Sequence, residues 1–195
     1  MTNNDQILIN QIVEGDTHAF ALLVDRYKDL VFTLALRMLK NREEAEEVAQ
    51  DTFIKTYKSL EKFKGDSKFS TWIYRVAYNT SLDRIKKNKK HFNEVEINEF
   101  TAHQVITIDN ALDRLETKEQ EEVIQRCIAL LPSEESFLLT LYYFDDLSLD
   151  DISKIVGITA NSIKVKLFRS RKKLATILKS QLEPETIAYY ERERR

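Results

Sequence analysis

Glycine and proline, the two residues that most often interrupt helices, are almost missing from this chain. Its 195 residues include only three glycines and two prolines, while apolar residues recur at helical spacing along most of its length. Turns and sheet connections usually need both residue types. We therefore predict an all-α protein with short connections, built as two small helical domains joined by a linker.

Charge and residue counts exclude several functional classes. The 30 basic and 32 acidic residues leave a formal net charge of −2. The chain has one cysteine, Cys127, and this count excludes a disulfide framework and a cysteine-based zinc site. Cys127 lies in an apolar pattern and is expected to be buried. The histidines (His18, His91 and His103) are scattered, so we expect no metal, no cofactor and no enzyme activity.

The chain shows no sign of membrane insertion or export. No apolar run approaches membrane-spanning length, and MTNNDQILIN lacks the basic-then-apolar order of a signal peptide. We expect a cytoplasmic protein.

Residues 1–92 are predicted to form the first helical domain. Asp16 is suited to cap a long helix, and Asn41 with Glu44 resembles a capping box that opens the next one. A short helix is expected at 6–13 and a further helix from about Ser70. The inward residues expected on the helix after Asn41 are Ala45, Val48, Ala49, Phe53, Tyr57 and Leu60.

Residues 93–118 and 183–195 lack a strong helical pattern. The first stretch is acidic, with no lysine or arginine from Asn93 until Arg114, and we predict a solvated linker that becomes helical toward its end. The second is a C-terminal tail to which the sequence assigns no role.

Residues 119–182 are predicted to contain a helix-turn-helix. In LSLDDISKIVGITANSIKVKLFRSRKKL, Ser148 can cap a short helix and Gly157 falls where that helix must turn sharply. Thr159 or Asn161 can cap the next helix, whose Ile163, Leu167 and Ser170 are expected inward.

The second helix of this motif is basic where it is expected to be exposed. Its cations are Lys164, Lys166, Arg169, Arg171, Lys172 and Lys173, with no acidic residue among them. Such a helix fits the major groove of DNA. Charge alone favours a solvated basic helix in any two-helix hairpin, but the glycine turn with its apolar corner at Ile158 reverses this and favours DNA binding.

Aromatic residues gather beside a basic run in KFSTWIYRVAYN, residues 68–79. Ile73, Val76, Ala77 and Thr80 are expected to face inward, while Trp72, Arg75, Asn79 and Lys86 line another face, and Tyr74 and Tyr78 a third. Aromatic rings beside cations are what single-stranded nucleic acids use for stacking. The alternative is that these rings simply fill the core.

The helix after Asn41 carries an acidic stripe. Glu43, Glu47, Gln50 and Ile54 are expected on one outward face, with Glu46 and Asp51 beside it. This face could dock a basic partner, or it could be a solvated surface favoured by the helix dipole.

Four segments together resemble bacterial RNA polymerase sigma factors of the sigma-70 family, in its compact extracytoplasmic-function (ECF) group. The resemblance covers about residues 6–92 and 119–178, in order. The segments are AFALLVDRYKDLVFTLALRML, EEAEEVAQDTFIKTYKSLEKF, KFSTWIYRVAYNTSLDRIKK and LPSEESFLLTLYYFDDLSLDDISKIVGITANSIKVKLFRSRKKL.

This resemblance implies a role for each segment. Residues 1–92 would be sigma region 2 and residues 119–182 sigma region 4. The core polymerase-binding residues would be Glu43, Glu47, Gln50, Asp51 and Phe53. The residues for −10 recognition and melting, with a flipped base held at loop 63–68, would be Phe63, Lys68, Phe69, Trp72, Tyr74, Arg75, Asn79 and Lys86. The −35 DNA-binding residues would be Asn161, Ser162, Lys164, Val165, Lys166, Arg169, Arg171 and Lys173.

The partners implied are core RNA polymerase and promoter DNA, duplex at the −35 element and single-stranded at the −10 element. An anti-sigma factor is a further implied partner, which no residue identifies. The chain departs from the family pattern at Asp151, often Glu, and at Val165 and Lys166, often small residues or arginine, so the −35 base preference does not follow from the resemblance. A helix-turn-helix repressor or activator and a helical enzyme or scaffold are the alternative functions.

Overall fold

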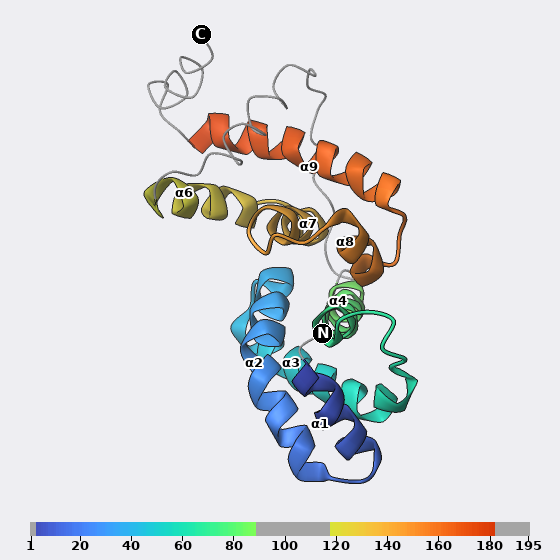
Figure 1. Cartoon of the computed structure of the whole chain (residues 1–195). Helices are drawn as coiled ribbons and strands as arrows, with labels where there is room; N and C mark the ends of the chain where they lie inside the picture. The colour runs from blue at the N-terminus through green and yellow to red at the C-terminus, as the bar shows by residue number, and fades with distance from the viewer. Residues whose placement is uncertain (1–2, 89–117, 182–195) are drawn as a thin grey trace. The chain divides into compact units, whose positions relative to one another are not determined.

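The computed structural model describes residues 3–88 and 118–181. Within these ranges every regular element is a helix, which confirms the all-α prediction. The chain divides into two compact units, one containing α1 to α4 and the other containing α6, α7 and α9 (Figure 1). The predicted linker, 93–118, lies outside the described residues except for Lys118, which begins α6, and the predicted tail, 183–195, lies wholly outside them.

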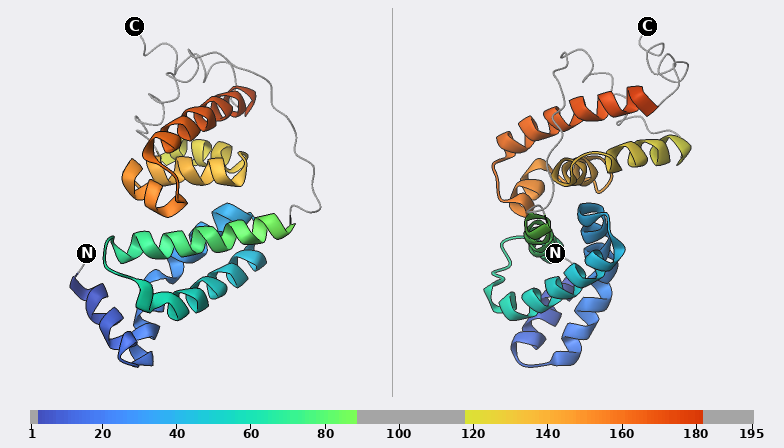
Figure 2. Two further views of the ribbon diagram at one scale, coloured as in Figure 1. Left: turned by 90° about the vertical axis from the view of Figure 1, so that its right-hand side faces the viewer. Right: turned by 180° about the vertical axis from the view of Figure 1, so that it is seen from behind.

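The first unit is a helical bundle. Its elements are α1 (Asn3–Val13), α2 (Thr17–Leu39), α3 (Arg42–Ser59), the 3₁₀ helix η1 (Leu60–Lys62) and α4 (Phe69–Asn88). Helix α2 packs against α1, α3 and α4, and α3 also packs against α4 (Figure 2). The fully buried side chains of this first unit include Leu23, Leu34 and Met38 of α2 and Phe69 and Ile73 of α4.

Local capping sets where two of these helices begin, as the sequence predicts. The Asp16 carboxylate accepts hydrogen bonds from the backbone N–H groups of His18 and Ala19, at 2.8 and 3.2 Å. The Asn41 side chain accepts one from the N–H of Glu44 at 3.0 Å. Each cap satisfies backbone donors that have no acceptor within the helix.

Helix α3 is rotated relative to the prediction. Its buried residues are Ala45, Val48, Thr52 and Thr56, whereas Tyr57, expected inward, is 45% exposed and Ala49 and Phe53 are only half-buried. Thr52 fits a core position because a threonine hydroxyl can donate to a carbonyl one turn earlier. Thr52 does so to the carbonyl of Val48, at 2.7 Å.

A buried polar group attaches α1 to α2. Asp5 is 5% exposed and forms an ion pair with Arg26. The hydroxyl of Tyr27 donates to the other carboxylate oxygen of Asp5 at 2.9 Å. Burial, together with this hydrogen bond, raises the pKa of Tyr27 far above its usual value. The arrangement gives the buried carboxylate the donors it needs.

The second unit is built around α9 (Ala160–Gln181). Helices α6 (Lys118–Ala129) and α7 (Ser133–Tyr143) both pack against it and against each other. The short helix α8 (Leu149–Val156) precedes α9 in the chain. Cys127 is buried as predicted, and burial raises the pKa of its thiol.

Candidate nucleic-acid interfaces

The turn between α8 and α9 has the geometry expected of a helix-turn-helix. Ser148 caps α8, accepting from the N–H of Asp151 at 3.1 Å while its hydroxyl donates to the Asp151 carboxylate at 2.8 Å. Gly157 has φ +79°, a left-handed conformation that residues with a side chain rarely adopt. Thr159 caps α9 by accepting from the N–H of Ser162 at 3.2 Å. Of the two caps considered, Thr159 is therefore the one used, and Asn161 lies inside the helix.

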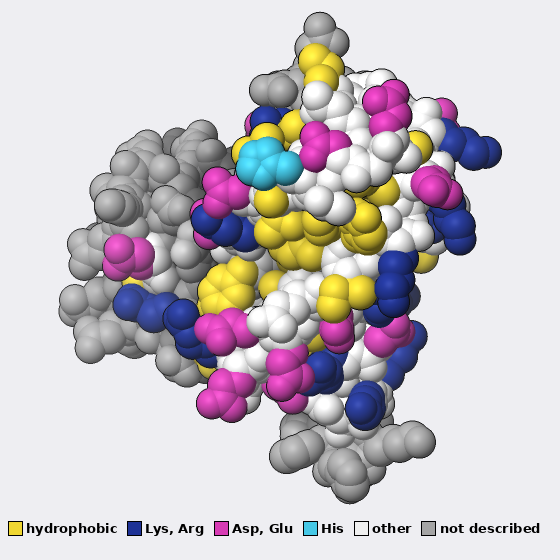
Figure 3. All heavy atoms as spheres, turned by 90° about the horizontal axis from the view of Figure 1, so that it is seen from below, with side chains coloured by type: hydrophobic (Ala, Val, Ile, Leu, Met, Phe, Trp, Pro, Cys, Tyr) yellow, Lys and Arg dark blue, Asp and Glu magenta, His cyan; other side chains and the backbone are white. Residues whose placement is uncertain are grey.

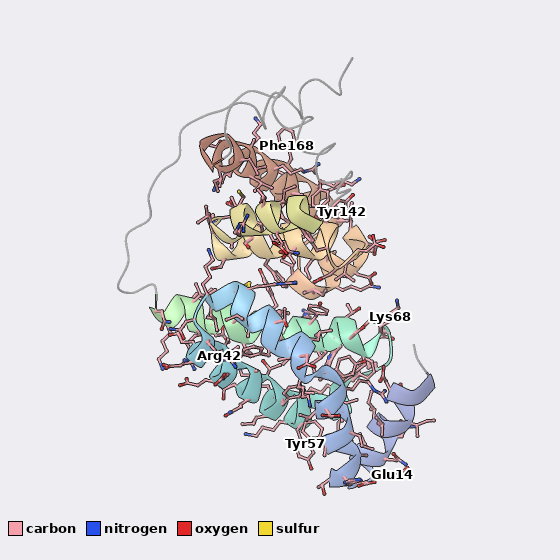
Figure 4. The ribbon with its side chains drawn as sticks, turned by 90° about the vertical axis from the view of Figure 1, so that its left-hand side faces the viewer. Glu14, Arg42, Tyr57, Lys68, Tyr142 and Phe168 are labelled. Atoms are coloured by element: carbon pink, nitrogen blue, oxygen red, sulfur yellow. The ribbon has the colours of Figure 1, made fainter. Side chains whose placement is uncertain are left out.

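Helix α9 has clearly separated inner and outer sides. Ile163, Leu167 and Ser170 are at most 1% exposed, as expected. The predicted DNA-binding residues Asn161, Ser162, Lys164, Val165, Lys166 and Arg169 are all exposed, whereas Arg171 and Lys173 are half-buried. Phe168, which the prediction omitted, is 41% exposed on this helix (Figure 4).

Two cations of α9 pair with acidic residues of α7. Lys173 Nζ lies 2.6 Å from Glu135 Oε1, and both side chains are largely covered. Lys166 Nζ lies 3.4 Å from Glu134 Oε2 in a more exposed pair. The Nε–H of Arg171 donates to the carbonyl of Leu167, 3.2 Å away. The two ion pairs link α9 to α7, and the pair with Glu135 reduces the charge that Lys173 can offer to another molecule.

Three aromatic rings of the first unit form what we call the aromatic cluster: Phe63, Phe69 and Trp72. Their ring centroids lie 5.4 to 5.5 Å apart. Phe69 is 1% exposed and Phe63 is 9% exposed, while Trp72 is half-buried. Of the three rings, Trp72 offers the most surface to a further planar group.

Polar and cationic side chains follow the aromatic cluster along α4. The loop from Phe63 to α4 turns at Gly65, which has φ +77°, and exposed Lys68 precedes α4 (Figure 4). Arg75, Asn79 and Lys86 are exposed along α4, and Tyr74 is half-buried. Tyr78, expected on the same face as Tyr74, is instead only 4% exposed.

The outer side of α3 combines acidic and apolar groups. Glu43, Glu47, Gln50 and Asp51 are exposed and Phe53 is half-buried. Ile54 and Tyr57 are 52% and 45% exposed, and the ring of Phe20 on α2 meets that of Tyr57 edge-on at 4.8 Å. Figure 3, which shows one whole face of the molecule, likewise has apolar side chains lying among acidic and basic ones. Glu47 also accepts from Arg84 of α4 at 2.8 Å, so part of its charge is used inside the unit.

Two absences apply to the described residues alone. Residues 3–88 and 118–181 contain no group of three histidine, cysteine, aspartate or glutamate side chains placed to hold a metal ion. Helices with the length and hydropathy of a membrane span are likewise absent from these two ranges.

Both units match models of known protein regions. Residues 23–91 match the model of Sigma-70 region 2, and residues 121–174 match that of Sigma-70, region 4. Together these matches cover more than half of the chain. The chain belongs to the sigma-70 family. Sigma factors of this family are initiation factors without a catalytic step, so the protein is not an enzyme.

Curated relatives place this sigma factor in the ECF group. It is 38% identical over 172 residues to the ECF RNA polymerase sigma factor SigW of Bacillus subtilis, covering 85% of this chain and 92% of the relative. It is 31% identical over 173 residues to the ECF RNA polymerase sigma-E factor of Escherichia coli K12, covering 86% and 90%.

Solved structures share the fold of this sigma factor. CnrH, in complex with the cytosolic domain of CnrY, aligns with a TM-score of 0.57 at 21% identity, over 92% of this chain and all of that one (100%). The sigma factor RpoE of Bartonella quintana, in complex with the anti-sigma factor NepR, aligns with a TM-score of 0.59 at 17% identity, over 84% and 98%.

Two features of this sigma factor were missed at the level of sequence. Exposed Phe168 follows Asn161 and Val165 at helical spacing, and that regular spacing could have revealed it. The contact of Asp5 with Arg26 and Tyr27 joins residues 21 and 22 positions apart, and no local pattern indicates it.

Proposed function

We propose that this sigma factor acts in the cytoplasm, binds core RNA polymerase, and directs the enzyme to promoters by contacting their −35 and −10 elements. It then assists opening of the DNA strands. The observation that carries this proposal is the combination of an outward basic helix on one unit with a half-exposed aromatic ring beside cations on the other. A basic helix suits the major groove of duplex DNA, and an accessible aromatic ring beside cations suits unpaired bases.

For the −35 element, we propose that α9 enters the major groove. Asn161, Ser162, Lys164 and Val165 lie in its first two turns, where a recognition helix contacts base edges. Lys166 and Arg169 follow, exposed, at positions suited to phosphates. Arg171 and Lys173 remain in the proposed set, with a weaker contribution expected because their polar atoms already bond within the unit.

For the −10 element, we propose that Trp72 stacks against an unpaired base held by loop 63–68. Phe63 and Phe69 support the Trp72 ring from behind, and Lys68, Tyr74, Arg75, Asn79 and Lys86 contact the strand. Stacking one base contributes about 1–3 kcal/mol, while opening two or three base-pair steps costs about 3–4 kcal/mol. This site therefore holds an opened base but depends on polymerase to maintain the bubble.

For polymerase binding, we propose the outer side of α3. Glu43, Glu47, Gln50 and Asp51 supply acidic and polar contacts, and Phe53 borders them. Ile54 and Tyr57 add exposed apolar surface on the same helix, of the kind that forms the desolvated centre of an interface. An acidic, partly apolar surface suits a partner that presents basic and apolar groups.

We also propose an anti-sigma factor as a partner. A solved sigma factor of similar fold was determined in complex with one. Such a partner would compete with core polymerase for the outer side of α3. Copurification from the native cell, followed by competition against purified core enzyme, tests this proposal.

Run-off transcription tests the main proposal. Purified core polymerase and genomic fragments are incubated with and without the protein. We expect discrete transcripts that appear only when the protein is present and that share −10 and −35 sequences upstream. No protein-dependent transcript from any part of the native genome would overturn the proposal. Specific binding of the chain alone to a palindromic site as a dimer would instead support the repressor function.

A further inference from the structure

The outermost side of α9 carries a continuous ridge of four residues, which we call the α9 ridge: Asn161, Val165, Phe168 and Lys172. At about 100° per residue, these positions fall within about 60° of one another around the helix. Ile163, Leu167 and Ser170 lie on the opposite side and are buried. The α9 ridge is therefore the part of the helix that projects farthest from the core of its unit.

The middle of the α9 ridge is apolar and exposed. Val165 is 50% exposed and Phe168 is 41% exposed, although both belong to a helix whose other outward residues are polar or charged. The Lys172 ammonium lies 5.0 Å from the centre of the Phe168 ring, which holds that side chain in place. An exposed apolar pair on a soluble helix often indicates a contact surface.

Cations flank the α9 ridge on both sides. Lys164 lies about 60° to one side of Asn161 and Arg169 about 80° to the other, by the same helical spacing, and both are exposed. The major groove of a duplex is complementary to this arrangement. Phosphates along both of its walls match the flanking cations, and the base edges on its floor face the ridge. The distribution of charge therefore favours DNA, rather than an apolar protein surface, as the binding partner of the α9 ridge.

The floor of the major groove offers one apolar group, the C5-methyl of thymine. The other base edges there carry hydrogen-bond donors and acceptors, and valine would remove water from them without replacing the lost hydrogen bonds. Val165 and Phe168 are separated by about 4.5 Å along the helix axis, against about 3.4 Å between successive bases of a strand. Two neighbouring base pairs thus come within reach of the two side chains.

We propose that Val165 contacts the C5-methyl group of a thymine in the −35 element, and that Phe168 extends this apolar contact to a neighbouring base pair. The inference rests on the proposed function of α9 and adds the chemical group that it recognises. It also names one base, thymine, within the −35 preference that the resemblance left open.

Uracil substitution tests this inference at the level of one methyl group. On a promoter found by run-off transcription, each −35 thymine of either strand is replaced singly by uracil, which removes only the methyl. Promoter affinity is then measured with the reconstituted holoenzyme. We expect roughly a three- to tenfold loss at one or two positions, the effect of one methyl group leaving an apolar contact.

The same promoters are then tested with Val165→Ser, which removes both valine methyls from an exposed helix position. We expect Val165→Ser to bind the thymine promoter more weakly and to lose its sensitivity to uracil, so that the two changes are not additive. Val13→Ser is the matched control, because Val13 is 51% exposed on α1 and should keep the wild-type response. Unchanged helix content and core polymerase binding establish that Val165→Ser folds.

The outcomes separate the two levels of the proposal. If the wild-type holoenzyme is insensitive to uracil at every −35 position, or if Val165→Ser remains as sensitive as the wild type, the thymine contact is overturned while promoter recognition stands. A failure of the wild-type protein to start transcripts contradicts the proposed function itself.

Discussion

At the scale of single residues, the aromatic cluster depends on side chains that lie beneath it. The ring of Tyr27 meets that of Phe69 at 5.3 Å, and Phe69 in turn contacts Trp72 at 5.5 Å. The hydroxyl of Tyr27 donates to Asp5 on α1. A chain of contacts therefore runs from the N-terminal helix to the ring that we propose stacks on a base.

Tyr27 gives the first unit a specific dependence on alkaline pH. Because the pKa of Tyr27 is raised in the folded state, its contribution to stability is fully present below about pH 10, the pKa of the unfolded state, and is lost as the pH rises above that value. Urea unfolding at pH 8 and pH 11 should show a larger loss for the wild type than for Tyr27→Phe. Tyr57→Phe, at an exposed position, should behave as the wild type. Equal losses in all three proteins would contradict this assignment.

Tyr27→Phe should also lower stability at neutral pH. The change removes one donor from buried Asp5 but leaves Arg26 in place, so the expected cost is about 1–2 kcal/mol of unfolding free energy. Urea unfolding at neutral pH measures it, with Tyr57→Phe again as the control.

Replacing Trp72 tests whether the protein opens DNA strands or only binds duplex DNA. In the double variant Trp72→Ala, Tyr74→Ala, the holoenzyme should still bind duplex promoter DNA but should lose open complexes, because the stacking surface is missing. Permanganate footprinting of unpaired thymines reports opening, and filter binding reports the closed complex. Normal opening by a folded double variant would contradict the −10 assignment.

At the scale of elements, the turn before α9 determines how that helix is presented. The left-handed conformation of Gly157 costs an ordinary side chain about 1–2 kcal/mol, and the strain falls on the joint between α8 and α9. Contacts from Glu134 and Glu135 of α7 hold the middle of α9 from another direction. The position of α9 thus depends on this backbone angle and on the two ion pairs, together with the burial of Ile163 and Leu167.

Gly157→Ala should therefore destabilise the second unit by about 1–2 kcal/mol and weaken promoter binding by the holoenzyme. Gly157→Asn is the matched comparison, because asparagine adopts the left-handed region more readily. It should retain more stability than Gly157→Ala. Thermal unfolding followed by circular dichroism gives the order of the three proteins, and alanine equal to glycine would contradict the role of the turn.

Ion pairs within the second unit should also determine how much each cation of α9 contributes to DNA binding. Lys164→Gln should lower the slope of log affinity against log salt by about 1 if it contacts a phosphate. Lys173→Gln should lower it less, because Lys173 is already paired with Glu135. The salt dependence of promoter binding by the holoenzyme measures both. Equal changes would show that the ion pair opens on DNA.

At the scale of the whole molecule, the proposed function requires two small surfaces to act together on one promoter. Neither proposed contact is strong alone, but attachment of both units to polymerase makes the second contact intramolecular and raises its effective concentration. The chain itself has a net charge of −2, which gives it no general attraction for DNA. Promoter recognition is therefore expected to belong to the holoenzyme.

The purified chain should accordingly bind promoter duplex poorly at physiological salt. We expect an affinity close to that for unrelated duplex, and a marked gain when core polymerase is added. Fluorescence anisotropy with both duplexes, with and without core enzyme, measures this difference. Tight and specific binding by the chain alone would contradict the requirement for polymerase.

Local sequence was enough to predict the capped starts of four helices and the buried side of α9. Asp16, Asn41, Ser148 and Thr159 bond to backbone groups within three residues of themselves, so these features depend only on near neighbours in the chain. The same holds for the buried spacing of Ile163 and Leu167.

The inward side of α3 depends instead on the contacts of that helix with α2 and α4. The fit against α2 and α4 buries Thr52 and Thr56 and leaves the larger, apolar Tyr57 exposed, the opposite of what hydrophobicity alone predicts. The tertiary structure also joined Asp5 to Tyr27 and paired Lys173 with Glu135. These outcomes depend on side chains from distant parts of the chain meeting in space, and no local pattern of residues carries that information.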